Sequence, residues 1–80
     1  MSLKAKYIAA FIEAFEVEED KVESLEYQSI PEWDSVGHMS LMAELEDAFD
    51  ITLEMDDIID FSSFQKGIET LKKYDIDLNE

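Results

Sequence analysis

Apolar side chains near the start of the chain recur at intervals of three and four positions, and lysines and a glutamate lie between them. Residues at this spacing share one face of an α-helix, so the pattern predicts an amphipathic helix of about three to four turns over residues 3–15. The acidic run at residues 16–20 ends the pattern. The apolar positions are Leu3, Tyr7, Ile8, Phe11, Ile12 and Phe15.

A second helical pattern begins after Pro31, at the pair Asp34-Ser35, and continues to Phe49. The β-branched pair Ile51-Thr52 interrupts this rhythm, because such side chains are stiff and less suited to helices. A short helix of about one to two turns is predicted over residues 56–61, since the acidic residues at its start complement the helix dipole.

The last helix is predicted over residues 64–74. Ser62 and Ser63 are typical of the position just before a helix, where a side-chain oxygen accepts a hydrogen bond from the first turn. Lys72 and Lys73 fall in the final turn, where positive charge is favourable. The remaining residues, 76–80 in particular, are expected to form a mobile tail.

The connection between the first and second helices is about 18 residues long, which is unusual in a compact domain. It is therefore either a loop with a purpose or a segment that contains a further element. Four apolar residues are spaced through it, and exposing all of them would be costly. We expect Val22, Leu25, Tyr27 and Ile30 to anchor the connection across the core.

Together these segments predict an all-α fold, a small four-helix bundle with a long first loop and a short third helix. No alternation of polar and apolar residues indicates a strand. The length of 80 residues corresponds to one domain, covering residues 1–80. The expected core residues are Phe11, Phe15, Leu45, Phe49, Ile68 and Leu71.

The formal net charge of −15 comes from 21 acidic residues against 6 lysines, with no arginine. Such a surface repels nucleic-acid phosphates and anionic lipid headgroups, so we expect no nucleic acid and no membrane partner, but partners with basic patches. A hydrophobic fraction of 46% is nevertheless too high for a disordered acidic tail.

Cysteine is absent, so the chain has no disulfide, no thiolate nucleophile and no cysteine metal site. No stretch approaches the roughly 18 apolar residues that span a bilayer. The lysines and apolar residues at the N-terminus superficially suggest a signal peptide, but Glu13 and Glu16 interrupt them. A cytoplasmic, monomeric protein is the expectation, and the chain resembles a complete, freestanding one.

Ser35 lies where the second helix begins, and this position suits an anion. The first backbone N–H groups of a helix lack partners and the peptide dipole is positive there, so a phosphate ester on the serine would be favoured. The simpler alternative is that Ser35 or Asp34 only caps the helix, which is common and worth about 1 kcal/mol.

Catalysis and metal binding are less well supported. Asp34, Ser35 and His38 suggest a hydrolase triad, but the glycine that a nucleophile elbow requires before the serine is replaced by Trp33. We therefore expect no catalytic activity and a solvent-facing His38. The acidic residues at 56–60 lack the glycine and closing glutamate of a calcium loop, so no dedicated metal site is expected.

The chain as a whole resembles acyl carrier proteins, in the wide family that includes peptidyl and aminoacyl carriers. The resemblance covers nearly all 80 residues: the order of helices, the long first loop, and a serine motif at the second helix. The family motif Asp-Ser-Leu corresponds to Asp34-Ser35-Val36. The helix that follows matches at Met39, Leu41, Met42, Leu45, Glu46, Asp47 and Phe49.

The resemblance implies that Ser35 bears 4′-phosphopantetheine, attached from coenzyme A by a phosphopantetheinyl transferase, with Asp34 and Val36 as flanking motif residues. The thiol of that group carries acyl or aminoacyl cargo as thioesters. This would account for the missing cysteine, because the sulfur belongs to the prosthetic group. Gly37 and Ser40 depart from the acidic residues common in fatty-acid carriers, which leaves the cargo open.

Partners implied by the resemblance are the transferase, an acyl- or aminoacyl-loading ligase, and acyltransferases or synthases with basic docking patches. The residues expected to contact them are Val36, Met39, Glu44, Glu46, Asp47, Asp56 and Asp57. A fatty cargo would insert between helices lined by Met39, Met42, Ala43, Leu45, Leu53 and Ile58, unless these residues simply form core.

A second hypothesis comes from the charge alone. An acidic helical module could bind and inhibit a basic partner, or mimic nucleic acid, without any prosthetic group. Such a module would keep its activity when Ser35 is replaced by alanine, whereas a carrier would lose it.

Overall fold

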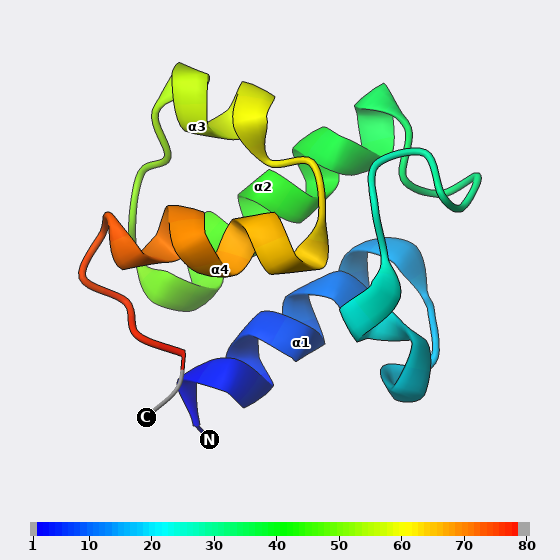
Figure 1. Cartoon of the computed structure of the whole chain (residues 1–80), viewed down its shortest axis with the longest axis horizontal. Helices are drawn as coiled ribbons and strands as arrows, with labels where there is room; N and C mark the ends of the chain where they lie inside the picture. The colour runs from blue at the N-terminus through cyan, green and yellow to red at the C-terminus, as the bar shows by residue number, and fades with distance from the viewer. Residues whose placement is uncertain (1, 79–80) are drawn as a thin grey trace.

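The computed structural model describes residues 2–78 and contains four α-helices and a short 3₁₀ helix. Figure 1 shows α1 and α4 lying near one another, with α2 behind α4 and the short α3 at one edge of the molecule. The predicted all-α bundle with a long first connection and a short third helix is confirmed. The elements are α1 (Leu3–Phe15), η1 (Glu19–Ser24), α2 (Ser35–Phe49), α3 (Met55–Asp60) and α4 (Phe64–Lys72).

The ends of the helices follow local capping chemistry. The Ser63 hydroxyl caps α4 by accepting a hydrogen bond from the backbone N–H of Lys66 at 2.9 Å, as predicted. Glu16 and Asp50 end α1 and α2 in the left-handed conformation, with φ of 55° and 53°. The boundaries of α1 and α2 agree with the sequence prediction. The last helix ends at Lys72, two residues earlier than predicted.

The long first connection contains the element that the hydrophobic pattern did not reveal, the 3₁₀ helix η1. Val22 and Leu25 anchor the connection as predicted, and both are buried. Backbone hydrogen bonds then fasten it to the start of α4: the Tyr27 N–H donates to the Ser62 carbonyl at 2.8 Å, and the Phe64 N–H donates to the Leu25 carbonyl at 3.0 Å. The Tyr27 side chain is exposed, so it is not an anchor.

The core is largely aromatic. Phe11, Phe15, Leu45 and Leu71 are buried as predicted, whereas the predicted core residues Phe49 and Ile68 are only partly buried. Sequence analysis missed a group of buried aromatic residues, of which Trp33 is the largest. Its ring stacks on Phe15, with ring centroids 5.2 Å apart, and contacts Phe11 edge-on at 5.6 Å. The other missed aromatic core residues are Tyr7, Phe61 and Phe64.

A polar cluster fastens the N-terminal end of α3 to the C-terminal end of α4. The Lys73 ammonium and the Tyr74 hydroxyl both donate to the Asp57 carboxylate, and the Glu54 backbone N–H donates to the Tyr74 oxygen at 2.9 Å. The hydrogen bond from Lys73, and then that from Tyr74, holds the pKa of Asp57 below its ordinary value. Burial and the bond to Asp57 raise the pKa of Tyr74.

The prediction of a mobile tail is wrong for the part of it that the structure describes. Ile76 and Leu78 are buried against the core, and the Ile76 N–H donates to the Leu71 carbonyl at 3.1 Å. These two side chains add apolar contact that the short α4 could not supply alone. Residues 79–80 of the predicted tail lie outside the described residues.

Candidate functional site

The start of α2 assigns separate roles to the two polar residues of the motif. The Asp34 carboxylate accepts a hydrogen bond from the Gly37 N–H at 2.8 Å and is therefore the helix cap. Ser35 is the first residue of the helix, its side chain is exposed, and its hydroxyl forms no hydrogen bond within residues 2–78. The capping explanation for the motif thus applies to Asp34 and leaves the Ser35 hydroxyl without a structural task.

Gly37 allows the preceding turn to pack directly on the first turn of α2. A β-carbon at this position would lie 1.9 Å from the Glu32 carbonyl oxygen and 3.2 Å from a ring carbon of Phe15. No side chain fits in that space without moving backbone. Gly37 therefore has a packing reason in this chain, and it fixes where Ser35 is presented.

A groove with a volume of about 450 Å³ opens beside Ser35, between the start of α2 and α3. Carbon atoms dominate its walls, which would favour an apolar occupant. The residues that line it are Ser35, His38 and Met39 from α2, Met55, Ile58 and Ile59 from α3, and Tyr27, Phe61 and Ser62 from the connections.

The exposed large apolar side chains of the described chain gather around this groove. Ile59, Met55 and Met39 are 70%, 69% and 53% exposed, and Tyr27 is 38% exposed. Val36, which follows Ser35 in the sequence, is 74% exposed. Scattered surface hydrophobics need no explanation, but a group of them around one groove is typical of a contact site.

Sequence analysis anticipated Val36 and Met39 but missed Met55, Ile59 and Tyr27. Ile58 and Ile59 are successive residues, whose side chains point about 100° apart around a helix axis, so one can face the core while the other does not. Ile58 is partly buried and Ile59 is exposed.

His38 is not solvent-facing, contrary to the prediction. The ring is half-buried, and its Nδ1 accepts a hydrogen bond from the Trp33 indole N–H at 3.0 Å. Its Nε2 lies 2.7 Å from the Ile58 carbonyl oxygen. His38 therefore joins three segments: the turn before Ser35, the first turns of α2, and α3. The buried indole needed an acceptor, and this is the reason that a surface assignment of the nearby histidine fails.

The predicted acidic docking residues do not form one surface. Asp57 is buried and already bonded to Lys73 and Tyr74, so we withdraw it from the docking set. The Glu46 carboxylate accepts a hydrogen bond from the Leu53 N–H at 2.8 Å and holds the connection after α2. Asp47 and Asp56 remain exposed.

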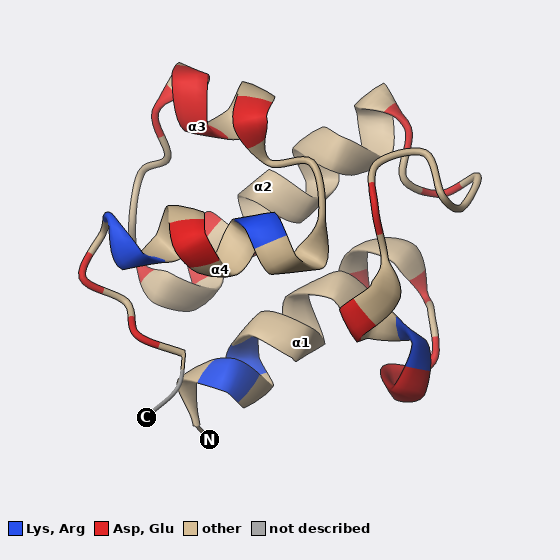
Figure 2. Cartoon of the chain, viewed as in Figure 1, with Lys and Arg blue, Asp and Glu red and all other residues tan. Residues whose placement is uncertain are grey.

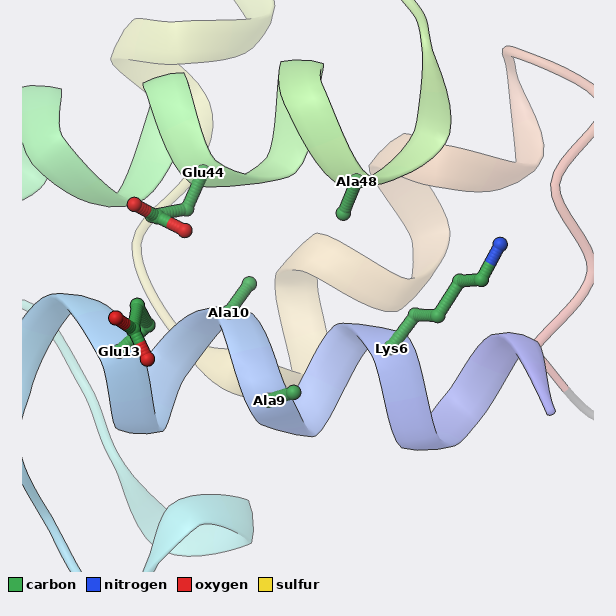
Figure 3. Close-up of a pocket in the computed structure, with 6 residues that line it drawn as sticks. All are labelled: Lys6, Ala9, Ala10, Glu13, Glu44 and Ala48. Atoms are coloured by element: carbon green, nitrogen blue, oxygen red, sulfur yellow. The ribbon is translucent and has the colours of Figure 1, made fainter. Parts of the chain in front are cut away.

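Glu44 lies on the side of α2 that faces α1. Figure 3 shows its carboxylate directed toward Glu13 across a shallow depression, with Lys6 toward the other end. This depression has a volume of about 330 Å³ and is also lined by alanines of α1 and α2, Ala9, Ala10 and Ala48. It is separate from the groove between α2 and α3, so Glu44 does not border Ser35.

Acidic residues are distributed over the whole molecule. In Figure 2 they occur on η1, α3, α4 and the connections, whereas the lysines lie mainly near the start of α1, near η1 and around α4. Of the two ion pairs found within residues 2–78, Lys4–Glu23 is long at 4.0 Å and exposed. Exposed pairs of this kind contribute little to stability.

Only two of the residues predicted to line a cargo cavity lie at the groove beside Ser35. Met39 and Ile58 line the groove, whereas Met42, Leu45 and Leu53 are buried core residues, and Ala43 is exposed outside the groove. For the buried three, ordinary core packing is the right interpretation, because close-packed interiors leave no room for a chain.

Residues 2–78 hold no candidate metal site and no membrane-spanning helix. No cluster of three or more histidine, aspartate or glutamate side chains could hold a metal ion. None of the helices in this part of the chain combines the length and the apolar character needed to cross a membrane.

These features define a class: a small acidic all-α protein with an exposed helix-start serine beside an apolar groove. Comparison with protein-family models and with curated proteins gave no match. A functional proposal therefore depends on the geometry of the site and on the resemblance described above.

Proposed function

We propose that this chain is an acyl carrier protein whose Ser35 hydroxyl is esterified with 4′-phosphopantetheine. The observation that carries the proposal is the state of that hydroxyl: it is exposed, it forms no hydrogen bond within residues 2–78, and it stands on the rim of an apolar groove. The sequence motif Asp34-Ser35-Val36 supports the same assignment by resemblance.

The residues around Ser35 fit a phosphodiester. The backbone N–H groups of Ser35 and Val36 belong to the first turn, where a helix has no internal acceptors, and the helix dipole favours an anion there. Asp34 directs its carboxylate to the Gly37 N–H, so this negative charge is engaged at the cap. In the transfer, the Ser35 oxygen would form the new ester bond and lose its proton to a base of a separate transferase. The pyrophosphate linkage of coenzyme A would break, and its nucleotide half would leave as adenosine 3′,5′-bisphosphate.

When bound, the group supplies a thiol on a flexible arm, a nucleophile that the chain lacks because it has no cysteine. The chain itself would present the group at Ser35 and shelter the acyl cargo. The groove beside Ser35 has the volume and the apolar lining to shelter a small acyl group. Met39 and Met55 are adaptable side chains that suit an occupant of variable shape.

Partner enzymes would contact the apolar side chains around the groove, which here include Val36, Met39 and Ile59. The strong negative charge of the chain would speed encounter with basic surfaces, while exposed and screened charges add little affinity. Such an interface forms fast and releases readily, as a shuttle requires. Of the acidic residues predicted to dock, Asp56 lies on α3 beside this apolar group.

The competing function is an acidic binding module without a prosthetic group. The spread of acidic residues over several helices and connections favours it, because a mimic of nucleic acid needs broad negative charge (Figure 2). The binding-module function gives no role to the Ser35 hydroxyl or to the groove beside it. The two functions therefore differ in whether they need the oxygen of Ser35.

Labelling with a fluorescent coenzyme A analogue and a broad-specificity phosphopantetheinyl transferase tests the proposal. We expect wild type and Ser40→Ala to become fluorescent, and Ser35→Ala to stay unlabelled. Ser40 is a matched control, because it is an exposed serine on the same helix. Wild type that stays unlabelled with two unrelated transferases, or label that persists in Ser35→Ala, would contradict the proposal.

A further inference from the structure

The hydrogen bonds of His38 fix which ring nitrogen carries the proton. An indole nitrogen can only donate, so the contact of 3.0 Å with Trp33 requires an unprotonated Nδ1. The single ring proton of neutral imidazole must then lie on Nε2. From there it donates to the Ile58 carbonyl oxygen, 2.7 Å away. Only the neutral Nε2–H form satisfies both contacts.

A protonated ring cannot keep both bonds. An imidazolium has an N–H at each nitrogen, so its Nδ1–H would face the indole N–H of Trp33. Trp33 is fully buried, and without His38 its N–H would have no acceptor. Two N–H groups directed at one another repel, and the indole N–H loses its acceptor in either case, so protonation displaces the ring from Trp33. The bond to Ile58 is lost with that movement.

Ile58 belongs to α3, a helix of only six residues. The Asp57 cluster holds its start, and the His38 bond holds its second half. Met55, Ile58 and Ile59 of this helix form one wall of the groove beside Ser35. The position of α3 therefore sets the width of that groove.

The titratable groups nearest His38 lie on the first connection, at the start of α2 and on α3. Tyr27 is in ring contact, with centroids 5.5 Å apart, and faces it from the first connection. The Asp34 carbonyl accepts the backbone N–H of His38, and its carboxylate accepts the backbone N–H of Gly37. On α3, Asp57 is engaged with Lys73 and Tyr74, and Asp60 is exposed. Neither ion pair found within residues 2–78 includes His38.

We propose that His38 is a positioning residue that holds α3 against the start of α2 and thereby sets how large an apolar group fits beside Ser35. In the neutral form the groove is narrow. Protonation of His38, or its replacement by a residue that cannot form both bonds, releases the second half of α3 and widens the groove. This inference concerns the unmodified protein and goes beyond the proposed carrier function, so its test does not depend on any modification of Ser35.

Nuclear magnetic resonance of ¹⁵N-labelled protein tests the tautomer first. At neutral pH we expect the His38 spectrum to show a protonated Nε2 and an unprotonated Nδ1. During acidification, the amide signals of residues 55–61 should move with the same midpoint as the His38 ring. A ring protonated at Nδ1, or α3 signals that ignore the His38 titration, would overturn the proposal.

Two variants separate positioning from a general effect of acid. Glutamine at position 38 offers one acceptor and one donor but does not titrate, so His38→Gln should keep α3 in place over the whole pH range. Asp57→Asn removes the nearby carboxylate titration, and the α3 response to His38 should persist in it. If His38→Gln does not fold, as judged by circular dichroism, the coincidence of the two midpoints in wild type decides alone.

Binding of the neutral dye Nile red measures the groove directly. Losing one hydrogen bond of ordinary strength should raise the population of open α3, and hence dye binding, roughly five- to tenfold on protonation of His38. His38→Gln should show no such rise, and Met39→Asp, which places charge in the groove, should abolish binding at every pH. Equal dye binding by wild type above and below the His38 midpoint would contradict the proposed widening.

Discussion

Replacing Gly37 with alanine tests how tightly the turn before Ser35 packs on α2. The new β-carbon would lie 1.9 Å from the Glu32 carbonyl oxygen, whereas real β-carbons essentially never approach within 3.0 Å of another atom. The carbonyl would have to retreat by about 1 Å. The obstacle is backbone, held by hydrogen bonds from the Trp33 N–H to Ile30 and from the Gln28 N–H to Trp33.

Two opposing effects decide the magnitude. Within a helix, alanine is favoured over glycine by about 1 kcal/mol. Forcing an extra carbon into a packed region costs about 1–3 kcal/mol, and more when backbone must move. Because the turn around Glu32 cannot yield by a side-chain rotation, we expect the cost to exceed the gain. The predicted net loss is about 1–2 kcal/mol in the free energy of unfolding, or roughly 5–10 °C in Tm.

Urea and thermal unfolding followed by circular dichroism measure this loss. Ala43→Gly is the matched control, because Ala43 is exposed on the same helix and reports the helix-propensity effect without a clash. We expect Ala43→Gly to destabilise by about 1 kcal/mol. If Gly37→Ala instead stabilises by that amount, the turn does not pack as described and the placement of Ser35 is wrong.

Three further predictions concern charge and docking. The pKa of Asp57 is lower in the folded chain than its ordinary value of 3.8. The ionised carboxylate therefore contributes its full stability above pH 3.8, and this contribution is lost as the pH falls through the pKa of the folded state. The acid unfolding curve of Asp57→Asn should lack this loss. Burial raises the pKa of Tyr7 above its ordinary value of 10.0, so the free energy of unfolding should fall as the pH rises past 10. Tyr7→Phe should remove this pH dependence. The variant should also lose about 1–2 kcal/mol of stability, because the hydrogen bond from the Tyr7 hydroxyl to the Phe64 carbonyl is lost. In labelling kinetics, Ile59→Ser should lower kcat/KM of the transferase by about tenfold more than Asp47→Asn, because apolar contacts dominate interface energies.

The helices were predictable because their signals are local. Spacing of apolar residues and capping serines or aspartates fixed α1 and α2 at the correct boundaries, and Ser63 marked the start of α4. The 3₁₀ helix was missed, since its six residues contain only one buried side chain, Val22, and so carry no helical periodicity.

The surroundings of Ser35 were less predictable because they depend on contacts between distant segments. The sequence around Trp33 predicts a loop residue, but the turn packs its ring onto Phe15. The sequence likewise predicts an exposed His38, but α3 places the Ile58 carbonyl next to its ring. Asp57 was counted as a docking charge because its partner Lys73 is sixteen residues away. The position of Asp34-Ser35 at the start of a helix could thus be predicted from the sequence, whereas the hydrogen bonds and packing of the surrounding side chains could not be predicted without the fold.

The account rests on one oxygen atom, that of Ser35. Intact mass spectrometry of the protein co-expressed with a phosphopantetheinyl transferase, with fragmentation to locate the added group, tests it most directly. The predicted result is a mass increase of one phosphopantetheine group on Ser35 and none in Ser35→Ala. A chain of unmodified mass, or a group located on another residue, would contradict it.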